Sequence, residues 1–206
     1  MRFLLLLLFL FPSVSFAAET LDAYYDTGDD TAGNLTDVQA QTWTALSTSD
    51  FSSVDLLLTV GGCAGGDSVS VYIVPTTLGI PNSGDYTNIA LRKMTVDCGT
   101  MSGTSWIKFT ATSTLAITSG TVYTIVAKST SASGPSWRVD TTAPTSYTDG
   151  VRWYCSVGAC TTWAVDGAGM DDLFRVYVML AVATPTPLDS FIIFGLLFPK
   201  QEIVYV

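Results

Sequence analysis

The sequence predicts an all-β protein, a two-sheet antiparallel β-sandwich that is jelly-roll-like and has about ten strands. Runs rich in Val, Ile, Thr, Tyr and Trp alternate with Gly, Ser, Asn or Asp between residues 36 and 180. No stretch in this range shows a sustained helical period with capping residues. Strict alternation at 68–74 places Val69, Val71 and Ile73 on one face of a strand.

The expected strands follow one another at short intervals. Apolar and polar residues alternate most clearly at 68–74, 121–128 and 173–180. Further strands are predicted at 38–46, 53–60, 88–96, 104–111, 136–141, 150–155 and 160–164. Many short strands joined by turns are typical of a sandwich or a barrel, and the sandwich is the preferred interpretation.

The N-terminus carries the features of a secretory signal peptide. Arg2 precedes an unbroken apolar run at 3–11, Pro12 ends that run, and small residues at 15 and 17 suit a signal peptidase. We therefore assign 1–17 as a signal peptide, cleaved after Ala17 or Ala18. The alternative is an uncleaved membrane anchor, but the apolar run is too short to span a bilayer. The mature protein is thus expected outside the cell or at its surface.

The C-terminus differs in character from the predicted sandwich domain at 18–182. A Pro/Thr linker at 183–187 is followed by a short apolar run at 191–198 within the tail 183–206. The run is too short to span a membrane. It is interpreted as a truncated anchor, with an interaction tail or a frayed end as alternatives, and a weak membrane or anchor contact is its expected partner interaction.

Composition excludes several functions. The 206-residue chain has 9 Lys+Arg against 18 Asp+Glu, and its net charge of -9 argues against nucleic acid as a partner. Histidine is absent, which removes histidine-based nucleophile systems and the HExxH metal site. The two glutamates, Glu19 and Glu202, lie in terminal segments, where a glycosidase carboxylate pair is not expected. We therefore predict that the protein is not an enzyme.

Four cysteines in an exported chain predict disulfide bonds. Cys155 and Cys160 flank a turn-like tetrapeptide, so the favoured pairing is Cys155–Cys160, which leaves Cys63–Cys98. Two other pairings remain open. The cysteine spacing fits a zinc site poorly.

Aromatic residues near the predicted Cys155–Cys160 loop form a candidate carbohydrate-binding site. Flat rings beside loops can cover the apolar face of a sugar ring. Trp153 and Tyr154 are consecutive, so one of them must face outward on a regular strand. The alternative is that these rings belong to the core. The candidate residues are Trp137, Trp153, Tyr154 and Trp163.

Aspartates at both ends of the domain form a candidate calcium site. The first and last segments of a sandwich often lie side by side, and Ca²⁺ prefers oxygen ligands. The alternative is that these residues cap turns. The candidate ligands of a structural Ca²⁺ are Asp26, Asp29, Asp30, Asp171 and Asp172, with Asp166 nearby.

The order of motifs between residues 38 and 178 resembles the choice-of-anchor type of β-sandwich domain. Such domains occur in uncharacterised bacterial surface and phage-associated proteins, and the resemblance implies the fold but no settled activity. The segment between Cys155 and Cys160 departs from the pattern, which more often has a Gly-Gly turn. The motifs are Gln41-Thr42-Trp43-Thr44, Gly79-Ile80-Pro81, Leu115 to Tyr123, Trp137 to Asp140, and Asp172 to Tyr177.

Together these observations favour a secreted or cell-surface, non-catalytic module that is adhesive or carbohydrate-binding. Its expected partner is a glycan or a surface polymer. The alternative is a structural protein of a virion or surface layer, and an extracellular glycan-active enzyme is a third interpretation. The signal peptide favours the first, because phage structural proteins assemble in the cytoplasm.

Overall fold

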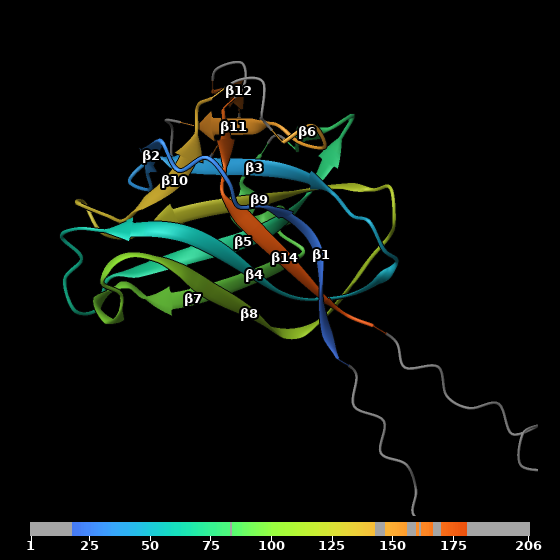
Figure 1. Cartoon of the computed structure of the whole chain (residues 1–206), viewed down its shortest axis with the longest axis horizontal. Coiled ribbons are helices and arrows are strands. Elements are labelled where there is room, and N and C mark those ends of the chain that lie inside the picture. The colour runs from blue at the N-terminus through green and yellow to red at the C-terminus, as the bar shows by residue number, and fades with distance from the viewer. Residues whose placement is uncertain are drawn as a thin grey trace, which may run out of the picture. The chain divides into compact units, whose positions relative to one another are not determined.

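Two antiparallel seven-stranded sheets make up the described part of the protein (Figure 1). The computed structural model describes residues 18–82, 84–142, 147–155, 160, 162–166 and 170–180. The predicted signal peptide at 1–17 and the predicted linker and tail at 183–206 lie outside these residues. The all-β sandwich predicted from the sequence is confirmed. Within the described ranges, no helix is long and apolar enough to cross a membrane.

The first sheet has the strand order β1-β14-β4-β10-β13, with β8 on the other edge of β4 and β2 on β10. The chain ends of the domain meet here, because β1 pairs with β14 from Glu19↔Met179 to Tyr25↔Phe174. Its strands are β1 (Glu19–Tyr25), β2 (Thr31–Asn34), β4 (Ser49–Val60), β8 (Gly103–Ile117), β10 (Ser136–Asp140), β13 (Asp171–Asp172) and β14 (Phe174–Met179).

The second sheet has the order β12-β11-β3-β9-β5-β6, with β7 also paired to β5. Consecutive long strands such as β3, β4 and β5 alternate between the two sheets, as in other β-sandwiches. Its strands are β3 (Val38–Thr44), β5 (Ser68–Thr77), β6 (Ile80–Pro81), β7 (Arg92–Asp97), β9 (Val122–Ser129), β11 (Arg152–Cys155) and β12 (Ala164–Val165).

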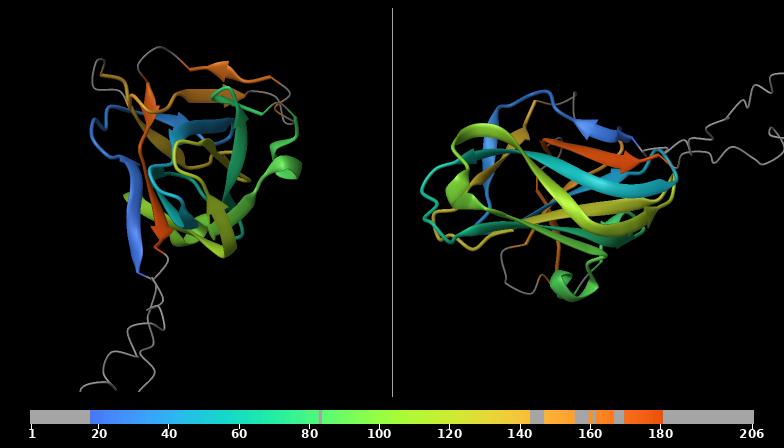
Figure 2. Two further views of the ribbon diagram at one scale, coloured as in Figure 1. Left: turned by 90° about the vertical axis from the view of Figure 1, so that its right-hand side faces the viewer. Right: turned by 90° about the horizontal axis from the view of Figure 1, so that it is seen from below.

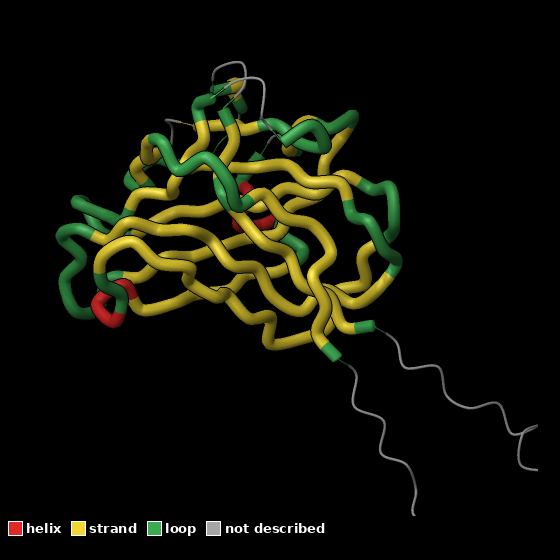
Figure 3. Tube along the Cα trace, viewed as in Figure 1, coloured by secondary structure: helices red, strands yellow, loops and turns green. Residues whose placement is uncertain are grey.

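Among the described residues, helical structure is confined to two short segments, drawn in red in Figure 3. One is α1 (Tyr86–Ile89), and the other is a 3-10 turn at Cys98–Thr100. The Asp85 side chain caps α1 by accepting a hydrogen bond from the Thr87 N–H at 3.0 Å. This helix occupies the start of the strand predicted at 88–96, so only its second half is extended.

The core lies between the sheets. Alternate residues of β3, β5 and β9 point inward and meet inward residues of β4, β8 and β14, as period-two strands require. These side chains are almost fully removed from water, which supplies the main driving force for folding. The largest are Trp43, Trp137, Phe51, Phe109, Phe174, Leu56, Leu58, Ile73 and Ile125.

A second apolar cluster covers the outer face of the second sheet. In Figure 2, α1 lies outside this sheet, on the side away from β1 and β14. The helix and the segment around Cys160 and Trp163 cover the sheet there. We call this group the outer cluster: Val38, Ala40, Tyr72, Val74, Tyr86, Val126, Trp153, Cys155, Cys160 and Trp163.

Candidate functional site

A pocket of about 600 Å³ opens at the edge of the outer cluster, where β5 turns into β6. Trp163 forms part of its wall, and its indole Nε1 donates a hydrogen bond to the Asn82 carbonyl at 3.2 Å. Mostly apolar walls with a few polar groups are typical of ligand sites. We call it the tip pocket; it is lined by Thr77, Leu78, Ile80, Pro81, Asn82, Ile89, Thr162 and Trp163.

Leu78 is held at the rim of the tip pocket in an unfavourable conformation. Leu78 and Gly79 form the two-residue turn of the β5–β6 hairpin, and both have positive φ, at 54° and 77°. Such turns favour Asn-Gly, because a β-carbon is strained in the left-handed region. Leu78 is nonetheless 97% exposed. A strained, solvent-exposed leucine beside a pocket contributes nothing to the core.

The four aromatic residues predicted to bind carbohydrate do not form one platform. Trp137 is fully buried between the sheets and donates from Nε1 to the Leu173 carbonyl at 2.7 Å. Trp153 lies in the outer cluster and is only 9% exposed, whereas Tyr154 points to the other side of β11 and is 36% exposed. Of the four, Trp163 alone lines the tip pocket.

The expectation that Trp153 and Tyr154 face opposite ways holds, with Tyr154 as the outward residue. The pocket residues Leu78, Ile80 and Ile89 were not predicted from the sequence to bind a ligand. The Leu-Gly dipeptide at a hairpin turn was the signal that could have identified the rim, because leucine is unusual at that position.

The aspartates of the first turn are held by cations and hydroxyl groups. Asp26 accepts from Arg175 at 3.0 Å, and Asp29 forms an ion pair with Arg138. Asp30 instead accepts from the hydroxyl groups of Thr141 and Thr142. β1 and β14 are adjacent as expected, but these carboxylates are directed to separate partners. Within the described residues, no group of three potential ligands is arranged to hold a metal ion.

Asp171 and Asp172 belong to a buried polar network between the sheets. Arg152 donates to Asp172 at 3.0 Å and to the Gln39 side chain at 2.9 Å, and it also forms an ion pair with Asp166. Gly33 of β2 lies so close to the Arg152 guanidinium that any side chain there would collide with it.

The second half of this network is formed by Gln41. Its side-chain amide donates to Asp171 at 2.9 Å, and its carbonyl oxygen accepts from the Asp172 N–H at 3.0 Å. Asp171 also accepts from the Tyr147 N–H at 2.9 Å. Burial raises the pKa of Asp171 to about 6 and that of Asp172 to about 7. These carboxylates therefore hold the two sheets together rather than facing an open ligand site.

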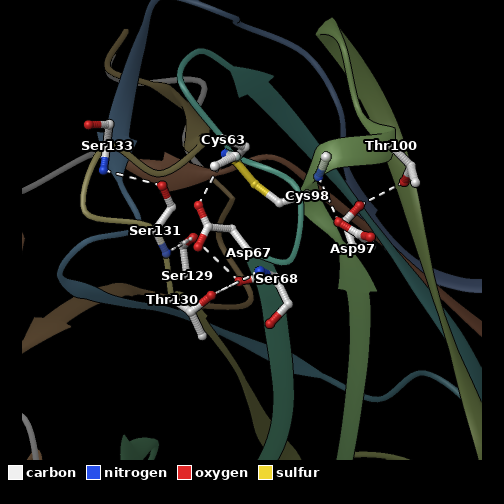
Figure 4. The surroundings of a disulfide bond; sticks show 12 residues. Cys63, Asp67, Ser68, Asp97, Cys98, Thr100, Ser129, Thr130, Ser131 and Ser133 are labelled. Atoms are coloured by element: carbon white, nitrogen blue, oxygen red, sulfur yellow. Dashed lines mark hydrogen bonds between the residues drawn. A yellow bond between two sulfur atoms is a disulfide. The ribbon is translucent and has the colours of Figure 1, made fainter.

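Both predicted disulfide pairings are confirmed. Cys155 and Cys160 have a Cα–Cα distance of 5.5 Å and lie in the outer cluster, close to the tip pocket. Cys63 and Cys98 have a Cα–Cα distance of 5.8 Å and join the β4–β5 loop to the end of β7 (Figure 4). The Cys63–Cys98 disulfide thus fixes a loop at the margin of the second sheet, and the Cys155–Cys160 disulfide crosslinks two residues of the outer cluster.

No protein-family model matches the sequence, and a search of curated proteins finds no significant relative.

Proposed function

We propose that the protein is a secreted or cell-surface, non-catalytic β-sandwich module that binds carbohydrate through the tip pocket. The observation that carries the proposal is the exposed, strained Leu78 at the rim of a mostly apolar pocket that Trp163 also lines. Apolar rings and aliphatic side chains contact the C–H faces of sugars, while the Asn82 and Thr162 polar groups suit hydroxyl groups.

The lining of the pocket favours binding over catalysis. The described residues that line it carry no ionisable side chain, so they offer no general acid, general base or charged nucleophile. The buried carboxylates Asp171 and Asp172 are instead engaged between the sheets. Two disulfides are consistent with an oxidising compartment, which supports export.

Leu78→Asn separates a binding role of Leu78 from a structural one. Asparagine tolerates positive φ far better than leucine, so we expect the free energy of unfolding to rise by about 1 kcal/mol. The same change removes an apolar contact, so binding to a glycan array should weaken or disappear. Urea unfolding and array binding of the full chain measure the two effects.

Leu46→Asn is the matched control, because Leu46 is 63% exposed and does not line the pocket. We expect it to leave glycan binding unchanged. Ile80→Ala, on the pocket wall, should weaken binding as Leu78→Asn does. Wild-type array binding by both pocket variants would refute the tip pocket as the binding site.

A further inference from the structure

A second, chemically different groove lies on the same outer face, further from the tip pocket along β5. It has a volume of about 350 Å³ and lies over β5 and the end of β9. Lys93 of the neighbouring strand β7 lies 5.5 Å from the centre of the Tyr72 ring. We call it the lysine groove; it is lined by Ser70, Tyr72, Lys128, Ser129 and Thr130.

The cations beside this groove form no ion pair with the described residues of the protein. On the first sheet, Lys108, Arg138 and Arg175 each form an ion pair with a carboxylate. Within the part of the chain that the structure describes, Lys93 and Lys128 form none. A chain with a net charge of -9 thus places two uncompensated ammonium groups on one face of one sheet.

The carboxylates closest in sequence to the groove are engaged elsewhere. Asp97 accepts from the Gly99 N–H at 2.8 Å, and Asp67 accepts from the Ala64 N–H at 3.1 Å. Asp85 caps α1. These side chains complete turns and a helix end, and among the described residues none of them forms an ion pair with Lys128.

Hydrogen bonds and a disulfide hold the groove rigid. The Thr130 hydroxyl accepts from the Ser68 N–H at 2.9 Å, and the Ser70 and Thr95 hydroxyls lie 3.1 Å apart. The Cys63–Cys98 disulfide fixes the loop before β5 to the end of β7 (Figure 4). A preformed site loses little conformational entropy on binding.

The surroundings of the groove favour a saccharide over a peptide. β5 is already paired with β7 on one side and β9 on the other, so its main-chain groups are not free to bind an extended peptide. The hydroxyl groups of Ser70 and Thr130 line the same groove as Lys128 and are each already hydrogen-bonded within the protein. Their remaining hydrogen-bonding capacity suits the hydroxyl groups of a sugar that also bears a negative charge.

We propose that the lysine groove binds the carboxylate of an acidic saccharide, with Lys128 as its principal cation and Lys93 as the second. The proposal rests on the proposed function in that the ligand is a carbohydrate, but it uses separate residues. A ligand of the lysine groove must carry negative charge, whereas the apolar tip pocket does not select for charge.

A matched pair of ligands isolates the charge. Trigalacturonate and its fully methyl-esterified form share their hydroxyl groups, and they differ in the carboxylate charges. We expect the full chain to bind the acid more tightly in calorimetric titrations. Lys128→Gln should lower the affinity for the acid roughly three- to tenfold, because one partly exposed charged contact is lost, and should leave the affinity for the ester unchanged.

Two further variants keep the test specific. Lys128→Arg retains the positive charge and should retain most of the affinity for the acid. Lys108→Gln makes the same charge change on the first sheet and should leave the affinity unchanged. Tight binding of the acid by Lys128→Gln, or an equal loss in Lys108→Gln, would overturn the proposal. Polyglutamate that competes as well as trigalacturonate would overturn the saccharide assignment.

Failure of this proposal can be told from failure of the proposed function. Binding of neutral glycans that depends on Leu78, together with an acid affinity that is insensitive to Lys128, would reject the lysine groove alone. Absence of all glycan binding, together with Lys128-independent polyglutamate binding, would reject both. Chemical-shift changes in the Lys128 and Ser70 amides on titration with monomeric galacturonate give a readout independent of the tip pocket.

Discussion

Trp153 and Tyr154, two residues of the predicted aromatic site, lie on opposite faces of β11. Successive side chains point to opposite faces of a strand, so Trp153 packs into the outer cluster and Tyr154 points the other way. The sequence shows that the two residues differ in direction. It does not show which of them is covered, because Cys160 and Trp163 join Trp153 in one cluster only in the folded chain.

Alanine substitution at these two positions should separate their roles. Trp153→Ala removes a ring that is only 9% exposed, so we expect the free energy of unfolding to fall by about 3–5 kcal/mol. Tyr154→Ala removes a ring that is 36% exposed and should cost under about 1 kcal/mol. Urea unfolding monitored by circular dichroism measures both. Equal losses would show that Tyr154 also packs in the core.

At the scale of elements, the sequence predicts strands where burial imposes alternation. The inward residues of β5 and β9 alternate strictly, and both strands are found close to the predicted ranges. β1 was not predicted, because a bulge between Leu21 and Ala23 interrupts its alternation. β2 and β13 consist of small or acidic residues, whose extended conformation depends on pairing with β10.

The functional surfaces were harder to predict than the strands. The cysteine pairs followed from spacing, since Cys155 and Cys160 lie five residues apart and leave only one other pair. The tip pocket instead combines β5, β6, α1 and the segment at Trp163, which are distant in the sequence. No local pattern specifies which of these elements meet on the outer face.

The two disulfides should stabilise the protein to different degrees. A crosslink constrains the unfolded chain more when it closes a longer loop. Cys155 and Cys160 are 5 residues apart, whereas Cys63 and Cys98 are 35 apart. We therefore expect Cys155→Ala/Cys160→Ala to cost about 2 kcal/mol and Cys63→Ala/Cys98→Ala about 4 kcal/mol.

Denaturant unfolding of the two double variants, compared with wild type, tests this order. Non-reducing peptide mapping of the wild-type protein supplies the control, because both crosslinks must be present before their loss is interpreted. A larger cost for the Cys155–Cys160 pair would indicate that this bond mainly preserves packing in the outer cluster.

For the whole molecule, the two sheets are joined by ionisable groups as well as by apolar packing. Asp171 and Asp172 are buried beside Arg152 and Gln41, and one Asp172 carboxylate oxygen has no hydrogen-bond partner within the described structure. A buried carboxylate without full pairing favours its protonated form. The stability of the sandwich is therefore linked to pH.

We expect the free energy of unfolding to fall as pH rises from 5 to 8. The two carboxyls ionise near pH 4 in the unfolded chain, but burial raises the pKa of Asp171 to about 6 and that of Asp172 to about 7 in the folded state. Between the unfolded-state pKa near 4 and these folded-state pKa values, the folded state binds more protons than the unfolded state. Stability therefore decreases as pH rises through this interval. The change should be on the order of 4 kcal/mol, because over this range the shift of Asp172 contributes about twice as much as that of Asp171. Glu19 has a lowered pKa, so its opposite contribution changes below this window.

Asp172→Asn should flatten this dependence. Asp172 accepts from Arg152 through one oxygen, and an amide can keep that contact while placing its NH₂ where the other oxygen has no partner. The variant cannot ionise, so the loss of stability between pH 5 and pH 8 should shrink, as urea unfolding at the two values would show. Asp37→Asn changes an exposed carboxyl and should retain the wild-type slope. A wild-type slope in Asp172→Asn would mean that Asp172 is already ionised at pH 5, with Arg152 outweighing the cost of burial.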